Sequence, residues 1–230
     1  MKHGKKYRAV AEKIDREKVY SLDEAIKIMK ENKIAKFDES VEVHVKTNID
    51  VKKGDQQVRS TVDLPHGTGK SKRIAVITST AAKAAKDAGA DVVGGEDLIE
   101  RIKSGKAFEK KGEFDILVAT PEMMPKLAQV AKILGPKGLM PNPKTDTVTT
   151  KVKETVEALK KGKAAFKNDS SGNVHQVVGK ISFDDTKLAE NIRTFVEAIE
   201  KAKPSGFKRK LIGNISICST MGVGLKISIR

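Results

Sequence analysis

Residues 74–93 read IAVITSTAAKAAKDAGADVV: a short apolar run, an alanine-rich segment and a second short apolar run. The first run, 74–78, predicts a buried strand, and residues 80–88 predict a helix that Gly89 ends. Residues 90–93 then predict a second strand. Buried strands joined by a helix are typical of parallel sheets with helices on both faces, so this stretch indicates an α/β fold for the middle of the chain.

The alternation of strand and helix continues downstream of this stretch. We expect a helix at 97–103, a third strand at 114–119, and a helix at 121–134 whose apolar positions recur at helical spacing. Residues 133–144, ILGPKGLMPNPK, then combine three prolines with two glycines, which predicts a specified loop, with an ordinary helix stop as the alternative. Residues 68–159 therefore predict an inserted three-layer α/β domain that is Rossmann-like.

The two flanks show a different pattern, with longer amphipathic strands and helices on one side. Ser21 and Glu24 predict a capping box ahead of a helix with one apolar stripe. Residues 40–46 alternate between valine and polar side chains, so one face of that strand is expected to be open to solvent or to a partner. Near the other end of the chain, Asp184 or Asp185 is expected to cap a further helix.

Four more strands are predicted in the C-terminal flank, at 164–167, 177–183, 211–218 and 224–229. Neither flank alone contains enough strands and helices to enclose a hydrophobic core. We therefore expect residues 1–67 and 160–230 to form one discontinuous, two-layer α+β domain around the insert. The predicted fold class is α/β overall, in two domains.

The chain carries a formal net charge of +15, from 45 Lys and Arg residues against 30 Asp and Glu residues. This excess indicates a polyanionic partner, either a nucleic acid or an anionic membrane surface. Residues 68–159 contribute +4 and the flanks +11, so the polyanion site is expected on the flanks. No apolar run of about 18 residues is available to span a bilayer, and no apolar leader follows the basic N-terminus. A cytoplasmic chain without a membrane partner is expected.

Residues 66–71, HGTGKS, end like a phosphate-binding loop. The competing hypothesis is therefore a nucleotide-binding or hydrolytic enzyme with Lys70 and Ser71 at the ligand. The motif needs a further glycine where the chain has Leu64, so a basic linker between domains is favoured. The histidines are scattered, and the single cysteine, Cys218, is expected in a strand or in the core, so only a three-dimensional cluster would assemble metal ligands. We expect no catalytic residues, no cofactor and no metal.

One segment of the N-terminal flank offers chemistry suited to RNA. Lys36 and Phe37 precede a strand whose polar face carries Ser40, Glu42 and His44. An aromatic ring beside hydrogen-bond donors and acceptors suits base edges, sugar hydroxyls and phosphate together. A merely solvated strand face is the alternative that these residues leave open.

A second segment, Ser219–Gly222, reads STMG between two predicted strands. Met221 is an unusual residue for a solvent-facing turn, and Gly222 allows a ligand to approach the backbone closely. Together with the hydroxyls of Ser219 and Thr220, this turn suits an RNA groove or an unstacked base. A buried turn is the alternative.

Six separated segments resemble, in the correct order, the L-one family of large-subunit ribosomal proteins: KHGKKYR, FDESVEVHV, LPHGTGK, ADVVGGEDLI, ILGPKGLMPNPK and STMG. The resemblance covers essentially the whole chain. Ser60 and Val223 depart from the family, which commonly has Gly and Pro there, and residues 105–113 lack a tryptophan often found at that place. These departures affect local loop geometry and leave the expected RNA face intact.

The resemblance implies a non-enzymatic protein of the large ribosomal subunit that binds the ribosomal RNA of the mobile stalk next to the exit site. It further implies assistance in movement and release of exit-site tRNA, and repression of translation by binding the protein's own operon mRNA. A monomer is expected when the protein is free of the ribosome. The residues expected to contact RNA are Lys36, Phe37, Ser40, Glu42, His44, Phe166, Lys167, His175, Ser219, Thr220, Met221 and Gly222.

A hinge is expected where the chain passes between the two predicted domains. Gly67 and Gly69 lie at one crossing, and Lys160 and Gly162 lie at the other. A double crossing with glycine on each strand permits bending without disruption of a core.

Overall fold

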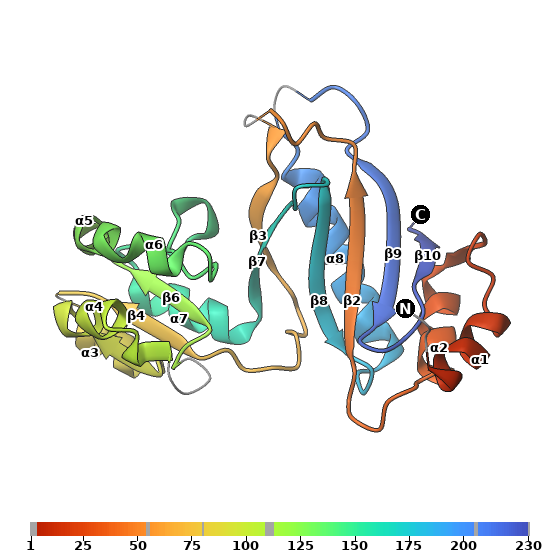
Figure 1. Cartoon of the computed structure of the whole chain (residues 1–230), viewed down its shortest axis with the longest axis horizontal. Coiled ribbons are helices and arrows are strands. Elements are labelled where there is room, and N and C mark those ends of the chain that lie inside the picture. Colours follow the sequence, from red (N-terminus) through yellow and green to blue (C-terminus); the bar gives the residue numbers. More distant parts are fainter. Residues whose placement is uncertain (1–3, 54–55, 80, 109–112, 205–206, 230) are drawn as a thin grey trace. The chain divides into compact units, whose positions relative to one another are not determined.

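The structure is a computed structural model that describes residues 4–53, 56–79, 81–108, 113–204 and 207–229. It confirms the mixed α/β class (Figure 1). The chain folds into two compact units. One unit comprises Met1–Gly69 with Ala164–Arg230, and the other comprises Lys70–Lys163.

The first unit is built on a five-stranded sheet in the order β1-β10-β9-β2-β8. Strand β1 runs parallel to β10, and the remaining pairs are antiparallel. Its strands are β1 (Val19–Ser21), β2 (Ser40–Thr47), β8 (Asn173–Lys180), β9 (Ile212–Ser219) and β10 (Leu225–Ser228). Alternation in β2 is as predicted: Val41, Val43 and Val45 are fully buried, and the residues between them are partly exposed.

Helices α2 (Leu22–Glu31) and α8 (Asp185–Lys201) pack against this sheet, and α1 (Lys5–Lys13) adds partly buried side chains to the same core. The predicted capping box is present, since the Glu24 N–H donates to Ser21 Oγ at 3.3 Å and the Ser21 N–H donates to Glu24 Oε2 at 3.2 Å. The three valines of β2 share a core with apolar residues of both α2 and α8. The polar residues of β2 therefore face away from these helices, because side chains alternate across a strand.

A two-stranded ribbon, β3 (Arg59–Asp63) with β7 (Lys163–Lys167), completes the strands of this region. Phe166 on β7 is 3% exposed and packs edge to face on Phe195, with ring centroids 5.5 Å apart. The prediction that Phe166 contacts RNA is therefore wrong for its side chain. An aromatic ring in an alternating strand fits either face of that strand. Here it packs against the apolar surface of α8.

The second unit contains a three-stranded parallel sheet in the order β5-β4-β6. Its strands are β4 (Ile74–Ile77), β5 (Val92–Gly94) and β6 (Ile116–Ala119), and its longer helices are α3 (Ala82–Asp87), α4 (Glu96–Lys103) and α7 (Val152–Lys161). Ala75 and Ile77 pack with the α4 side of the sheet, whereas Ile74 and Val76 pack with α7. The sheet is therefore covered on both faces, as its continuous apolar strands predict.

The helix predicted at 121–134 is interrupted. The chain instead forms η3 (Pro121–Met123), α5 (Met124–Leu127), η4 (Ala128–Val130) and α6 (Ala131–Leu134). Pro125 provides no N–H for an intrahelical bond, which favours short pieces with mixed hydrogen bonding. Leu127, Val130 and Leu134 are nevertheless fully buried, so the apolar spacing was interpreted correctly.

Other boundaries differ from the prediction. Strand β8 begins at Asn173 and ends at Lys180, earlier than the predicted 177–183. Asp169 accepts bonds from the backbone N–H groups of Ser171 and Asn173, and this short turn places the start of the strand. The short helical turns η2 (Lys106–Phe108) and η5 (Pro143–Thr145) complete the elements. In the proline-rich loop, Asn142 Oδ1 accepts from the Lys144 N–H at 2.8 Å, so this loop has a specified local structure.

Candidate nucleic-acid interface

The polar face of the five-stranded sheet is open in its centre, where β2 lies between β8 and β9. Glu42 on β2 pairs in register with Cys218 on β9, and His44 pairs with His175 on β8. We call these four residues the central cluster. All are partly or largely exposed. Residues from distant parts of the sequence thus meet in two cross-strand pairs, an arrangement that depends on the strand order.

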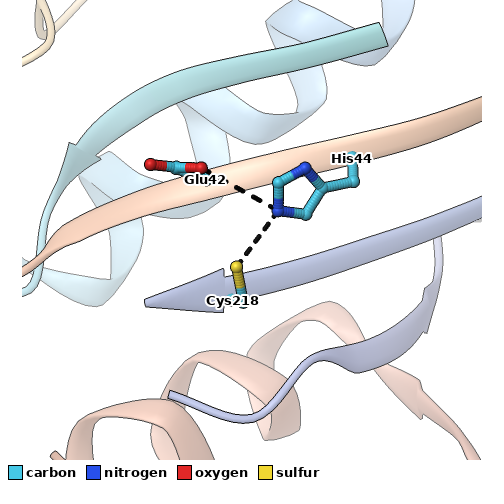
Figure 2. A group of neighbouring side chains, drawn as sticks. All are labelled: Glu42, His44 and Cys218. Atoms are coloured by element: carbon cyan, nitrogen blue, oxygen red, sulfur yellow. Dashed lines mark hydrogen bonds and ion pairs between the residues drawn. The ribbon is translucent and has the colours of Figure 1, made fainter. Parts of the chain in front are cut away.

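His44 is the centre of this cluster (Figure 2). Its Nε2 lies 3.1 Å from Cys218 Sγ and 4.0 Å from Glu42 Oε2. Its Nδ1 lies 2.7 Å from His175 Nδ1, a hydrogen bond in which one ring donates and the other accepts. Burial lowers the pKa of His44, and the neighbouring His175 lowers it further, against the opposing effect of Glu42. Burial, with Glu42 nearby, raises the pKa of the Cys218 thiol to about 11.

The turn after β9 is tied to the start of β2 by the backbone of Ser40. The Ser40 N–H donates to Thr220 Oγ1 at 3.0 Å, and the Thr220 N–H donates to the Ser40 carbonyl at 3.0 Å. Met221 is 52% exposed, so the turn presents an apolar side chain to solvent. A Cβ at Gly222 would collide with Ser219 Oγ, which explains the glycine. The solvent-facing interpretation of this turn is therefore the correct one for Thr220 and Met221.

Glu39 anchors this turn through buried hydrogen bonds. The sequence-based prediction did not include Glu39. Its side chain is fully buried and accepts from the Ser219 hydroxyl at 2.5 Å, the Ala35 N–H at 2.7 Å and the Met221 N–H at 3.2 Å. Burial raises the pKa of Glu39, but these hydrogen bonds outweigh it and leave the pKa below its usual value. No spacing signal marks Glu39, because it stands one residue before the alternating run begins.

Ser219 is 2% exposed, and its hydroxyl is engaged by Glu39. It therefore positions the turn, and the prediction that it contacts RNA is wrong for its side chain. The loop before β2 carries Lys36 and Phe37 at the surface, and Phe37 is 54% exposed. An exposed phenylalanine and an exposed methionine thus lie on the two segments that Glu39 joins.

Lys167 is exposed on β7, which belongs to the two-stranded ribbon and not to the five-stranded sheet. It lines a cleft of about 460 Å³ together with Lys52, Arg59 and Asp169. Asp169 Oδ2 lies 3.5 Å from His175 Nε2, and backbone hydrogen bonds from Asn173 and Ser171 help lower the pKa of Asp169 to about 2. The cleft is therefore linked to the central cluster through the Asp169–His175 pair.

The residues predicted as a hinge differ in their surroundings. Gly67, Gly69 and Gly162 have positive φ angles of 63°, 72° and 131°, a region that favours glycine. Asn191 accepts from the His66 N–H at 3.2 Å and donates to the Gly67 carbonyl at 3.0 Å, which holds that segment on α8. Lys160 lies in the last turn of α7, so its backbone is helical and does not belong to a connecting segment.

The segment HGTGKS connects β3 to β4, that is, a strand to a strand. A phosphate-binding loop leads from a strand into the N-terminus of a helix, whose free N–H groups bind the phosphate. The geometry needed for that function is therefore absent at Lys70 and Ser71 in the described part of the chain. The favoured interpretation, a linker, matches this connection.

Together, the fold and the surface define a basic α/β protein in which one face of the five-stranded sheet is open to solvent. This class includes many proteins that bind nucleic acids. Residues 29–223 match the model of the ribosomal protein L1p/L10e family, so the chain belongs to that family. It is 49% identical to "Large ribosomal subunit protein uL1" of Mesoplasma florum, over 100% of this chain and 99% of that protein. It is also 49% identical to the protein of the same name from Thermosipho africanus, over 98% of this chain and 96% of that protein.

This membership confirms the resemblance and the expectation that the chain is not an enzyme, because the family consists of ribosomal proteins. None of the helices in the described ranges combines the length and apolar character needed to cross a bilayer.

Proposed function

We propose that the chain is a protein of the large ribosomal subunit, in the cytoplasm, and that its first unit binds the ribosomal RNA of the mobile stalk next to the exit site. The names of the relatives support the subunit, and the family resemblance suggests the stalk. The observation that carries RNA binding is Met221, an exposed apolar side chain on a turn that Glu39 and Ser40 immobilise. A ligand that covers this side chain removes apolar surface from water, which favours binding.

Recognition would combine direct contacts to bases and sugars with electrostatic contacts to phosphates. Phe37 and Met221 offer apolar surfaces to unstacked bases, and Thr220 offers a hydroxyl to sugar or base edges. Glu42, His44 and His175, which are partly or largely exposed, add donors and acceptors. The excess of Lys and Arg supplies the salt-dependent remainder through phosphate contacts.

The chain would act as two domains, a discontinuous one of residues 1–67 and 160–230 and an inserted one of residues 68–159, and the two compact units of the structure support this division with boundaries a few residues away. The connections run beside Gly69 and Gly162, whose positive φ angles support a hinge there. We expect Gly67 to stay with the first domain, because Asn191 holds its carbonyl. Single-molecule energy transfer between one label on each unit should report several distances in the free protein. A single narrow distance would contradict the hinge.

Movement of the insert would accompany release of exit-site tRNA, and binding of a similar structure in the protein's own operon mRNA would repress translation. Both activities need only the RNA site and the hinge. We propose that the protein acts as a monomer when it is free of the ribosome, since one chain carries the whole surface described above.

A titration tests RNA binding directly. The protein is mixed with a labelled stalk RNA fragment, an unrelated RNA of equal length, or ATP, at low and at moderate salt. We expect tight and selective stalk binding that survives moderate salt, weakens in Thr220→Val and is little changed in Lys70→Ala, because direct contacts then exceed the electrostatic contribution.

Equal binding of both RNAs that disappears with salt would reduce the protein to a general basic RNA binder. Saturable binding of ATP would support the nucleotide-binding hypothesis instead. The same assay with the operon mRNA leader tests repression, and failure of that RNA to compete with the stalk fragment would exclude a shared site.

A further inference from the structure

The central cluster also contains a set of side chains whose chemistry suits a metal ion. Glu42, His44 and Cys218 each offer one ligand atom, and these atoms lie within 4.8 Å of one another (Figure 2). The three residues come from two neighbouring strands, with Glu42 directly paired to Cys218 and His44 two positions further along β2. Backbone hydrogen bonds therefore fix the spacing of the three side chains before any ligand arrives.

From this juxtaposition, we propose that Glu42, His44 and Cys218 form a binding site for a divalent transition metal of the zinc type. Thiolate and imidazole are the ligands that such ions prefer over calcium or magnesium. Three protein ligands leave the fourth tetrahedral position to water. The site faces the open side of the sheet, where His44 is 29% and Glu42 is 36% exposed in their side chains, so an ion has access.

The distances between the ligand atoms are close to those expected around a bound zinc ion. Zinc with bond lengths of about 2.0–2.1 Å to nitrogen or oxygen and about 2.3 Å to sulfur would place tetrahedral ligands about 3.4–3.6 Å apart. In the structure His44 Nε2 is 3.1 Å from Cys218 Sγ and 4.0 Å from Glu42 Oε2. All three ligand atoms lie within 4.8 Å of one another, and rotation about the side-chain torsions would bring them to bonding distance of one ion.

The second nitrogen of His44 is already engaged as in a typical metal site. Nδ1 lies 2.7 Å from His175 Nδ1, and His175 Nε2 faces Asp169 at 3.5 Å. If His44 Nδ1–H donates to His175, then Nε2 carries the free lone pair that points at Cys218. Ligating histidines commonly donate the N–H of their outer nitrogen to an acceptor, which orients the ring and strengthens the ligand, and His175 Nδ1 would be that acceptor here.

Binding of the metal ion releases one proton, which comes from the Cys218 thiol. The Cys218 S–H bond breaks, the proton passes to solvent, and the sulfur binds the divalent ion as a thiolate. His44 binds through its neutral Nε2 and Glu42 through its carboxylate. No group is oxidised or reduced in this step.

Cobalt(II) is the probe, because a thiolate bound to it gives a near-ultraviolet charge-transfer band and tetrahedral coordination gives intense visible bands. We titrate cobalt(II) into the full chain without RNA, and then add zinc(II). Both sets of bands should saturate at one equivalent and disappear when zinc replaces cobalt. Since RNA is absent, the outcome is independent of the proposed ribosomal function.

Variants assign the ligands. Cys218→Ser should remove the charge-transfer band, and His44→Gln and Glu42→Gln should each weaken cobalt binding. His175→Asn should weaken it about tenfold to a hundredfold through the orientation of His44. His66→Gln is the matched control, because His66 also faces a carboxylate, Glu190 at 2.6 Å, but lies outside the cluster. It should leave binding unchanged.

Thermal unfolding without metal should be similar in all variants, which separates loss of a ligand from loss of the fold. Absence of the thiolate band at one equivalent would overturn the proposal. So would a band that His44→Gln leaves intact, or weak bands of octahedral type that Cys218→Ser does not change.

Discussion

Replacing Met221 with alanine is expected to weaken binding of the stalk RNA about tenfold to a hundredfold, because burial of a methionine side chain contributes about 1.5–3 kcal/mol. The free energy of unfolding should change by no more than about 0.5 kcal/mol, because the side chain is 52% exposed. The dependence of binding on salt should keep its slope, since no phosphate contact is removed. Titration with labelled RNA at several salt concentrations measures all of these quantities except the unfolding free energy, which needs a denaturant series.

The chain offers a matched control for this substitution. Val19 is 57% exposed, similar to Met221, but lies on β1 at the edge of the sheet. Val19→Ala should leave RNA binding unchanged, whereas Phe37→Ala should resemble Met221→Ala. Equal effects of Val19→Ala and Met221→Ala would show that general surface apolarity, and not the turn, governs affinity.

Replacing Glu39 with alanine is expected to have the largest effect on stability, with a loss of about 2–4 kcal/mol in the free energy of unfolding. The substitution leaves the Ser219 hydroxyl and two backbone N–H groups without their buried acceptor. The turn then loses its fixed position, so RNA binding should fall as well. Chemical denaturation, followed by RNA titration under conditions where the variant is folded, measures both effects.

Two variants sharpen this test. Glu39→Gln keeps one acceptor oxygen and should lose less stability than Glu39→Ala. Asp38→Ala removes the neighbouring carboxylate, which accepts from Ser182 at the surface, and should cost about 1 kcal/mol or less. If Asp38→Ala were as damaging as Glu39→Ala, the buried position of Glu39 would not be the cause.

The pH dependence of the protein's stability follows from the Glu39 carboxylate. Its pKa in the folded protein lies below the ordinary value of 4.5, so the folded state holds fewer protons there than the unfolded state. The stabilisation is therefore complete above that ordinary value and is lost as the pH falls through the folded-state pKa. Wild-type stability should consequently decrease more steeply on acidification than the stability of Glu39→Gln.

The apolar periodicity of the chain was enough to predict most of the elements. Buried runs alternated with helical segments in the middle, and Val41, Val43 and Val45 alternated with polar residues in β2, because burial on one or both faces dictates these patterns. The small element β1 and the ribbon strand β3 were not predicted, since runs of three to five residues carry little periodic signal. Helix α7 was missed as well, although its apolar stripe was available.

For the surface, residue chemistry alone was enough to select side chains suited to RNA, and an unusual turn composition identified Thr220 and Met221. Which of these side chains reach solvent depends on the packing of the folded domain. It buried Phe166 against Phe195 and Ser219 against Glu39. It also placed Cys218 beside His44, 174 residues away in sequence. Local sequence dictates backbone propensity and polarity, whereas neighbours across a sheet depend on strand order, which arises from packing of the whole domain.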